Sequence, residues 1–529
     1  MDSIFSSNVD VLIVGAGPTG LTLACDLARR GISHCIIERS DSYSVASRAK
    51  TIMPRSLEVA DDLGFVESIV SKGVTDLPAR YYNDKGDFID KPGLSIPATP
   101  EQSTPYPDPV WIAEFDVEAA LRARYAQLGG HVKLSTTAVE LSQDDNGVTV
   151  AVAAPEGGRH VRARYVVGAD GGKSTVRKLI DRPLVGHTYE NQRWYLGDVR
   201  LQGLNPGRMH IWASEEGMIG LTPLPGTDIW QLQSTIPTDI EEPEKPSLEL
   251  YQAMLNRRAG AENIVVAHAS WLSIYRVNVR MVDSYRNGRV FLAGDAAHVH
   301  SPAGGQGMNT GMQDAYNLGW KLAAVLRGAN AALLDTYDEE RRPVARAVLE
   351  DSTKRLGATM KTVTDSRSLS ASLGKISDDL TSGLLVSYPD SSLTQPMADE
   401  SIAGPRPGDR APDATGLQGD GFDGSVFDLL RGPHWTLLAF TDGPLPSLSH
   451  IDRSELHVHR MARPDARAVD GFVDREGNAY RVYASNGNEA VLIRPDGYIA
   501  LRCKCDDETE INDYLHSKQE FAANYGKRK

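Results

Sequence analysis

Short, almost continuously apolar segments predict strands that are buried on both faces. Residues 9–14 (VDVLIV) and 34–39 (HCIIER) lie on either side of a helical segment, 21–30, which ends at Gly31. The segment 290–293 (VFLA) repeats the apolar pattern far along the chain. Strands of this kind are typical of parallel sheets, because helices cover both faces of such sheets. The pattern therefore predicts an α/β domain whose sheet is assembled from distant segments.

Residues 183–282 follow a different pattern, in which apolar and polar positions alternate, as in 208–212 (RMHIW) and 229–233 (IWQLQ). Alternation is typical of antiparallel sheets with one wet or ligand-facing side, so we expect the substrate platform here. His210 and Trp212 share one strand face, and Gln231 and Gln233 share another. Either pair is a candidate for substrate contact. Packing or solvent exposure is the ordinary alternative for any one of the four.

Helical periodicity predicts long helices at 111–129, after Gly311 and at 337–353. A stretch rich in Ser, Asp and Gly, from about 364 to 404, predicts a broken or weakly helical link. The pattern then restarts with predicted strands at 435–440 and 490–493. The sequence therefore predicts a separate C-terminal domain.

The turn between the first two strands carries the sequence Gly15-Ala16-Gly17-Pro18-Thr19-Gly20, and Glu38 ends the second strand. Strand, glycine turn, helix and terminal acid together form a dinucleotide-binding fingerprint. Gly15 permits the tight turn, Gly17 lets a pyrophosphate approach the backbone, and Gly20 lets helix and strand pack closely. Glu38 is expected to accept hydrogen bonds from ribose hydroxyls and to disfavour a 2′-phosphate. This site therefore suits FAD or NAD.

A second glycine-rich stretch follows the predicted strand at 290–293. It begins with Gly294-Asp295-Ala296-Ala297-His298 and continues through 301–311 (SPAGGQGMNTG) to the start of a helix. Unpaired N–H groups at a helix start favour an electron-rich ligand. Two such elements about 280 residues apart predict one long cofactor, FAD. Because only one fingerprint exists, NAD(P)H is expected to bind transiently in a surface groove.

Composition and charge limit the classes of molecule that the protein is expected to bind. The chain has 56 Lys and Arg against 70 Asp and Glu, a net charge of −14, which disfavours nucleic acid. No apolar run approaches the length of a membrane span, and the N-terminus lacks signal-peptide features, so a cytoplasmic location is expected. The four cysteines form no C-x-x-C pair, and His298-x-His300 has no third ligand nearby in sequence. We expect neither a metal site nor thiol redox chemistry.

The fingerprint turn, Asp170-Gly171 and Gly294-Asp295 occur in the order seen in single-component flavin aromatic hydroxylases. The chain resembles this family along essentially its whole length. It is most similar to the phenol, chlorophenol and polyketide hydroxylases with a C-terminal thioredoxin-like domain. The resemblance implies a Rossmann-like FAD-binding domain, an interleaved antiparallel-sheet substrate domain, a helical linker and a thioredoxin-like domain. Their expected residues are 1–76, 110–182 and 283–355; 77–109 and 183–282; 356–403; and 404–529, respectively.

The resemblance also implies roles around non-covalently bound FAD. Glu38 and Arg39 would flank the adenosine, Arg48 would approach the pyrophosphate, and Val139 would lend its backbone to the adenine. Asp295 would bind the ribityl or ribose hydroxyls, and Asp170 would hold the cofactor site together beside the path of the nicotinamide nucleotide. A surface charge for Arg48 and a plain turn role for Asp170 are the alternatives. Glu114 replaces a Gln that usually contacts FAD, and a carboxylate cannot donate as an amide does.

The loop at 305–309 is expected to carry the chemistry. The N–H groups of Gly305, Gly307, Met308 and Asn309, with the dipole of the following helix, would face the flavin N1 and C2 carbonyl. The Pro302 carbonyl would line the reaction cavity, unless Pro302 only shapes the loop.

The activity that the resemblance implies is NAD(P)H- and O₂-dependent hydroxylation of a phenolic or polycyclic aromatic substrate through a flavin C4a-hydroperoxide. Baeyer–Villiger or epoxidising oxygenation is an alternative on the same scaffold. A non-catalytic flavin-binding regulatory protein is another, against which the intact loop at 304–311 argues. A homodimer is left open.

Overall fold

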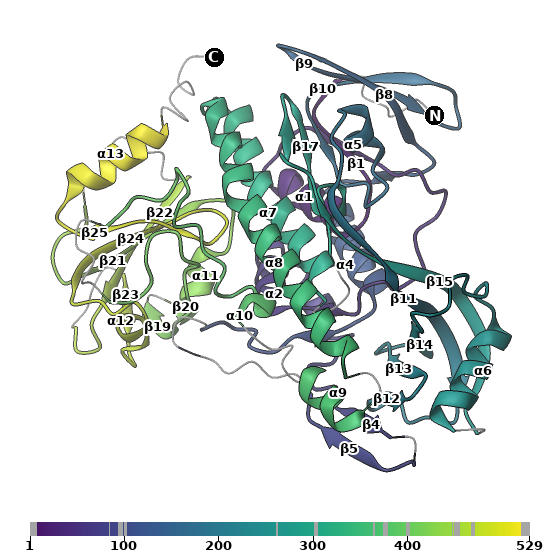
Figure 1. The fold of residues 1–529 in the computed structure, drawn as a ribbon. Coiled ribbons are helices and arrows are strands. Elements are labelled where there is room, and N and C mark those ends of the chain that lie inside the picture. The colour runs from purple at the N-terminus through teal and green to yellow at the C-terminus, as the bar shows by residue number, and fades with distance from the viewer. Residues whose placement is uncertain are drawn as a thin grey trace.

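The structure is a computed structural model in which the chain forms three large sheets joined by helices (Figure 1). It describes residues 8–83, 85–93, 99, 103–260, 263–300, 305–362, 365–373, 379–397, 403–419, 421–446, 448, 455–466 and 471–519. The fold class is the mixed α/β architecture that the sequence predicts.

The first sheet is assembled from strands far apart in the sequence, in the order β16-β17-β10-β1-β2-β7, with β8 and β9 beside β10. The pairs β1–β2, β1–β10, β10–β17 and β2–β7 are parallel, and the central strands are apolar on both faces, as their sequences predict. The strands are β1 (Asn8–Val14), β2 (His34–Ile37), β7 (Val132–Lys133), β8 (Thr137–Asp144), β9 (Gly147–Ala153), β10 (Arg159–Gly168), β16 (Arg286–Asn287) and β17 (Val290–Leu292).

Helix α1 (Pro18–Arg29) packs against α7 (Gln306–Leu326) and α4 (Glu114–Gln127). Gly311 makes the α1–α7 approach possible, because a Cβ there would lie 2.4 Å from Thr19 Oγ1. The same part of the chain also contains the helices α2 (Pro54–Leu63), α3 (Val66–Val70), α5 (Thr175–Leu179) and α8 (Thr336–Met360).

Several element boundaries differ from the prediction. Helix α1 begins at Pro18 rather than 21, because proline suits the first turn of a helix. The helix predicted from 111 begins at Glu114, because β6 (Val110–Trp111) pairs with β3 (Thr51–Ile52). Helix α8 continues to Met360, and α9 (Ser366–Leu373) and α10 (Asp379–Ser382) follow it.

The second sheet is almost entirely antiparallel, in the order β18-β15-β11-β14-β13-β12-β4-β5. Helix α6 (Leu248–Ala259) covers its outer face, where Tyr251, Met254 and Leu255 pack in one core with Trp212 and Trp230 (Figure 1). The strands are β4 (Ala79–Tyr82), β5 (Phe88–Lys91), β11 (Val185–Gln202), β12 (Met209–Ser214), β13 (Gly217–Pro223), β14 (Ile229–Ile236), β15 (Val265–Met281) and β18 (His298–Val299).

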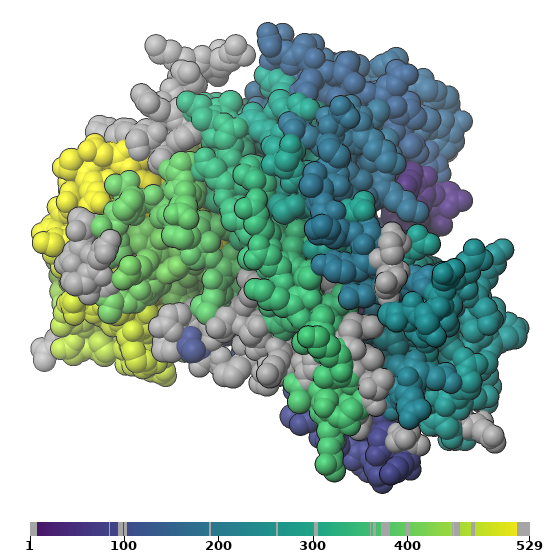
Figure 2. All heavy atoms as spheres, viewed as in Figure 1, coloured from purple at the N-terminus to yellow at the C-terminus, as the bar shows by residue number. Residues whose placement is uncertain are grey.

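The C-terminal part forms a third, mixed sheet in the order β20-β19-β23-β22-β21-β24-β25. Figure 2 shows this part lying directly against the helices of 306–360. Its strands are β19 (Thr415–Gly419), β20 (Phe422–Ser425), β21 (Trp435–Thr441), β22 (Leu456–Ala462), β23 (Phe472–Asp474), β24 (Asn488–Ile493) and β25 (Ile499–Lys504), and its helices are α11 (Val426–Leu430), α12 (Asn478–Val482) and α13 (Glu508–Gln519). Among the described residues, no helix combines the length and apolar character that a membrane span needs.

Candidate active site

A cavity of about 1990 Å³ lies between the first sheet and the inner face of the second. Its walls include the carboxyl ends of β1, β2 and β10, the start of α7, and residues of α8 and α9. The carboxyl ends of parallel strands are where α/β sheets bind ligands. Small-molecule pockets are usually about 300–1,000 Å³, so this cavity has room for a dinucleotide and a second molecule.

Two helices begin at the cavity without a side-chain cap among the described residues. Gly17 is the N-cap of α1 and Gly305 that of α7. The first-turn N–H groups of both helices are therefore available to an anionic or electron-rich ligand. A Cβ at Gly17 would meet nothing within 4 Å, so the backbone stands open there. This cradle fits the phosphate and ring edges of a flavin dinucleotide.

Glu38 lies at the end of β2, on the cavity wall. Its carboxylate accepts hydrogen bonds from Ala16 N (3.0 Å) and Ser40 N (3.0 Å), which hold it beside the glycine turn. Arg39 lines the same region. Val139 does not line the cavity: it is the extra residue of a β-bulge, its side chain is 46% exposed, and the neighbouring Ala138 lines the cavity. The backbone role of Val139 at the adenine stays a prediction.

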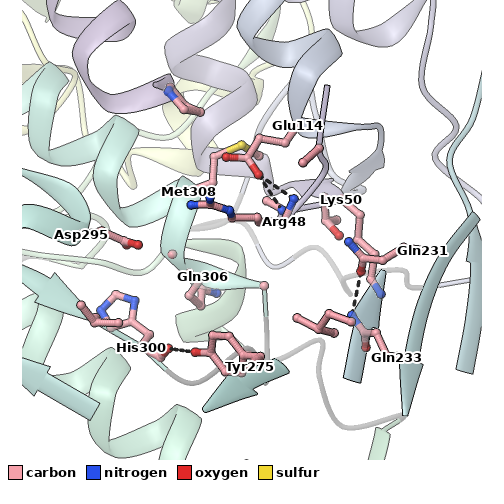
Figure 3. A pocket seen from close by; sticks show the side chains of 18 of the residues that line it. Arg48, Lys50, Glu114, Gln231, Gln233, Tyr275, Asp295, His300, Gln306 and Met308 are labelled. Carbon is pink, nitrogen blue, oxygen red and sulfur yellow. Dashed lines mark hydrogen bonds between the residues drawn. The ribbon is translucent and has the colours of Figure 1, made fainter. Parts of the chain in front are cut away.

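Residues 47–50, which we call the clamped loop, are held between two acids. On one side the Glu114 carboxylate accepts hydrogen bonds from Arg48 N (2.9 Å) and Ala49 N (2.9 Å). On the other side Asp198 of β11 accepts one from Ser47 N (2.6 Å). Figure 3 shows the bonds to Glu114 and the Arg48 side chain beside the cavity. A carboxylate at position 114 therefore serves as an acceptor for the backbone, which explains how Glu replaces the expected Gln.

Burial raises the pKa of both acids that hold the clamped loop. The pKa of Asp198 rises to about 6, through desolvation and the charge of Glu114, against the opposing effects of Ser47 N and Lys50. Desolvation also raises the pKa of Glu114, although the N–H groups of residues 48 and 49 oppose it. Each acid is therefore costly to ionise, and the loop's N–H groups offset part of that cost.

Asp295 follows β17 and faces the cavity with no hydrogen-bond donor among the described residues. Desolvation by the surrounding protein raises the pKa of Asp295, against the charges of His298 and Arg48. His300 also lines the cavity. Its carbonyl accepts a hydrogen bond from the Tyr275 hydroxyl (2.9 Å), while neither ring nitrogen has a partner in the described part of the chain (Figure 3). The Asp295 carboxylate and the buried His300 ring therefore both offer polar atoms to a ligand in the cavity.

The other predicted cofactor residues divide into two groups. Pro18, Thr19, Asp170, Gly307 and Met308 line the cavity, although the Asp170 carboxylate also caps α5 through Thr175 N (2.6 Å). Gly20, Gly294 and Asn309 lie behind the wall. Asn309 accepts a hydrogen bond from Met53 N (2.9 Å) and donates to Gly305 O (2.9 Å), so it positions the loop. Pro302 lies outside the described residues.

Only one of the two candidate substrate pairs reaches the cavity. Gln231 and Gln233 line it, and Gln233 Nε2 donates to Gln231 Oε1 (2.7 Å). His210 and Trp212 are not among the residues that line the cavity, because their strand turns that face toward the core beneath α6. His210 Nδ1 shares a hydrogen bond with the Tyr82 hydroxyl (2.9 Å), and the Tyr82 ring stacks on Trp212.

Most of the apolar residues that line the cavity were not predicted from the sequence. An alternating pattern defines two faces on each strand but does not show which one lines a cavity. On β12 the face with the polar residue His210 was chosen as the candidate, whereas the opposite face lines the cavity. The inner face is largely apolar and aromatic, and its cavity-lining side chains include Trp194, Leu196, Met209, Ile211, Met218 and Trp271. Lys50 and Tyr275 also line the cavity and were missed. Within the described ranges, no group of His, Cys, Asp or Glu side chains could hold a metal ion.

Comparison with known proteins identifies relatives over almost the whole chain. A family model for an FAD binding domain matches residues 8–352, and one for the aromatic-ring hydroxylase C-terminal region matches 404–518. A flavin-dependent monooxygenase of Mycobacteroides abscessus is 38% identical over 501 residues, covering 93% of this chain and 96% of the relative. The 6-methylpretetramide 4-monooxygenase of Streptomyces rimosus is 31% identical, covering 96% and 93%.

Among solved structures, a ternary complex of aklavinone-11 hydroxylase with FAD and aklavinone superposes with a TM-score of 0.80. That protein is 26% identical, and the match covers 98% of this chain and 99% of that one. The similarity therefore extends over both sheets that enclose the cavity and over the C-terminal part.

Proposed function

Because this chain belongs to the FAD-binding aromatic-ring hydroxylases, we propose that its cavity holds FAD at the first sheet and a polycyclic phenol against the second. The protein is an FAD-dependent aromatic monooxygenase of the kind that uses NAD(P)H and molecular oxygen. One observation carries the proposal: a single cavity joins two uncapped helix starts to the inner face of an antiparallel sheet.

The residues at the first sheet would hold the cofactor. The start of α1 would receive the pyrophosphate with Arg48, and Glu38 would accept the adenosine ribose hydroxyls. Asp295, which lacks a donor in the described structure, would accept hydroxyls of the ribityl chain. The start of α7 would face the flavin ring, where its N–H groups favour negative charge.

Bound FAD, once reduced by NAD(P)H, supplies the electrons and the activated oxygen. The protein orients the reacting groups and excludes water from them. The clamped loop and Asn309 would fix the two walls on either side of the ring. The apolar face of the second sheet would exclude water from the reacting atoms, which limits wasteful side reactions.

The substrate is proposed to be polycyclic and phenolic. The inner sheet face offers wide aromatic and aliphatic side chains such as Trp194 and Ile211, which suit a flat ring system. Gln231 and Gln233 can exchange hydrogen bonds with ring hydroxyls and carbonyls. The names of the relatives favour ring hydroxylation over Baeyer–Villiger oxygenation.

We also propose the domain division 1–76, 110–182 and 283–355 for FAD and 77–109 and 183–282 for substrate, with 356–403 as link and 404–529 as C-terminal domain. The interleaved strands of the first two sheets support this division. A homodimer and a cytoplasmic location stay predictions from the sequence.

Anaerobic stopped-flow reduction tests the function. FAD-loaded protein is mixed with NADH or NADPH, alone and with phenol, 1-naphthol or alizarin, and aerobic products are examined by mass spectrometry. We expect a polycyclic phenol to accelerate flavin reduction by on the order of tenfold, about 1.4 kcal/mol of barrier, and to gain one oxygen atom. Unaccelerated reduction with no oxygenated product from any ring would contradict the proposed substrate class.

A further inference from the structure

Lys50 is a cation on the cavity wall that the cofactor assignments above do not use. It belongs to the clamped loop, and among the described residues its ammonium group donates one hydrogen bond, to Thr222 Oγ1 of β13 at 3.3 Å. In the described part of the chain no carboxylate forms an ion pair with it. A desolvated ammonium group with a single neutral partner is costly, unless a ligand supplies the missing negative charge.

Neighbouring residues hold the loop that carries Lys50 in place, and the Lys50 ammonium group stays mostly charged although burial lowers its pKa. Ser47, three residues earlier, donates its N–H to Asp198 and accepts at its carbonyl a hydrogen bond from Gln231 Nε2. The clamped loop is therefore fastened to the second sheet on the Lys50 side. Desolvation lowers the pKa of Lys50 to about 8, while the negative charge of Asp198 opposes the decrease. The group is still mostly an ammonium ion at neutral pH.

The side chain lies with the polar groups of the substrate wall. Gln231 pairs in register with Thr222 on β13 and with Asp198 on β11, so these three share one row across the inner sheet face. Figure 3 shows Lys50 beside Gln231 and across the cavity from Asp295. A cation and an amide at one end of an apolar wall form a subsite for an oxygen substituent on a flat ring.

We propose that the Lys50 ammonium group binds an ionised oxygen of the aromatic substrate, so that the enzyme selects rings with an acidic hydroxyl or enol. This inference rests on the proposed function. When such a substrate binds, its hydroxyl proton passes to solvent, Lys50 keeps its own protons, and the oxyanion replaces the missing partner. An ionised hydroxyl also makes the ring electron-rich, which favours its attack on activated oxygen.

Reduced flavin is a second source of negative charge, and the structure favours the substrate. Thr222, the hydrogen-bond partner of Lys50 among the described residues, belongs to the second sheet, whereas Asp295 lies across the cavity from Lys50. The flavin's negative charge is matched by the N–H groups of α7. Lys50 is thus placed for the substrate oxygen.

The test uses the FAD-loaded enzyme with alizarin, whose visible spectrum reports ionisation of its hydroxyls, and with anthraquinone, which has no hydroxyl. Lys50→Met removes the charge and Lys50→Arg keeps it. Lys72→Met is the matched control, because Lys72 is exposed and pairs with Asp116 outside the cavity. We expect Lys50→Met to weaken alizarin binding by about tenfold to a hundredfold and to raise the pKa of the bound hydroxyl. Anthraquinone binding should change less than about threefold, within the spread of such effects.

Lys50→Arg should restore ionised alizarin in the bound state, and Lys72→Met should match the wild type. Equal alizarin affinity and spectra in the wild type and Lys50→Met would overturn the inference while leaving the proposed function intact. Loss of FAD affinity or a changed flavin midpoint potential in Lys50→Met, with alizarin ionisation unchanged, would assign the cation to the flavin instead. Failure of the wild type to bind either dye would overturn the substrate class and this inference together.

Discussion

Two lysines with desolvated ammonium groups, Lys50 at the cavity and Lys321 beneath the C-terminal part, have opposite surroundings. Burial lowers the pKa of each to about 8. Lys321 Nζ lies 2.7 Å from a Glu340 carboxylate oxygen and 2.8 Å from Asn317 Oδ1. Among the described residues, Lys50 has only the Thr222 hydroxyl as a hydrogen-bond partner. The same residue type is therefore satisfied by the protein in one region and left for a ligand in the other.

The charges around Lys321 form what we call the junction network, between α7, α8 and the turn after β24. Arg494 binds Glu340 through two bonds of 2.6 and 2.9 Å and also binds Asp496 (2.6 Å). Burial raises the pKa of Glu340, but the charges of Arg494 and Lys321 more than offset that effect and lower it. Figure 2 shows the two parts of the chain in contact along this side.

The comparison of the two lysines distinguishes charges that stabilise the fold from charges that are available to bind a ligand. In the junction network each charge has an opposite charge at hydrogen-bond distance. Removal of one member therefore leaves the remaining buried charges without one of their partners. On the cavity wall neither Lys50 nor Asp295 forms an ion pair at hydrogen-bond distance with a described residue, so their removal should cost binding rather than stability. Four substitutions can break or sharpen this comparison.

The largest effect is expected from Glu340→Ala, which leaves Arg494 and Lys321 buried without their shared partner. We expect the free energy of unfolding to decrease by about 3–5 kcal/mol, measured by urea denaturation. Glu339→Ala is the control, because the neighbouring carboxylate is exposed and accepts hydrogen bonds only from Ser392 in the described structure. A loss below about 1 kcal/mol for Glu340→Ala would place the junction network among surface-like pairs.

Asp295→Ala should show the reverse behaviour. Loss of a charge-assisted acceptor is expected to raise the FAD dissociation constant by about tenfold to a hundredfold, roughly 1.5–3 kcal/mol. The flavin-free protein should be no less stable, because the carboxylate has no donor in the described structure. Fluorescence titration with FAD measures the first quantity, and urea denaturation the second. Asp283→Ala, on the exposed Arg182 pair, should change neither. Unchanged FAD affinity would remove Asp295 from the cofactor site.

Asp198→Asn should change how stability depends on pH. The pKa of Asp198 is about 6 when folded and about 3.9 when unfolded, so the native state binds the extra proton between these values. This group's contribution to stability therefore falls as pH rises from about 4 to 6. Asparagine keeps an oxygen for Ser47 N but does not titrate. The stability of Asp198→Asn relative to wild type should rise by about 2 kcal/mol between pH 4.5 and 7. Parallel curves would refute the raised pKa.

The smallest effect is expected from Glu114→Gln. An amide oxygen can still accept hydrogen bonds from Arg48 N and Ala49 N, while the negative charge beside the expected pyrophosphate disappears. FAD should bind several-fold more tightly, an effect of about 1 kcal/mol or less. Glu114→Ala is the comparison variant that removes the acceptor altogether. It leaves both N–H groups without an acceptor and should weaken FAD binding. Weaker binding to Glu114→Gln would show that the carboxylate itself is required.

Local sequence was enough to predict the cofactor and the turn proposed to hold it. Residues 9–39 contain strand, glycine turn, helix and acid in one continuous stretch, and each step depends on neighbours in the chain. Apolar segments likewise predicted the parallel strands, because burial on both faces leaves a continuous apolar run. The order of the three motifs then identified the family.

Tertiary structure decided which polar groups meet in the cavity. Alternation in 208–212 and 229–233 defined two faces per strand, but the packing of α6 against Trp212 chose the buried face and left Ile211 and Gln231 for the cavity. The clamped loop joins residue 47 to Asp198 and residue 48 to Glu114, across long sequence separations. Periodicity in the sequence shows that successive side chains of a strand lie on alternate faces of the sheet. Only the docking of distant elements determines which face is covered and which charge stays without a partner.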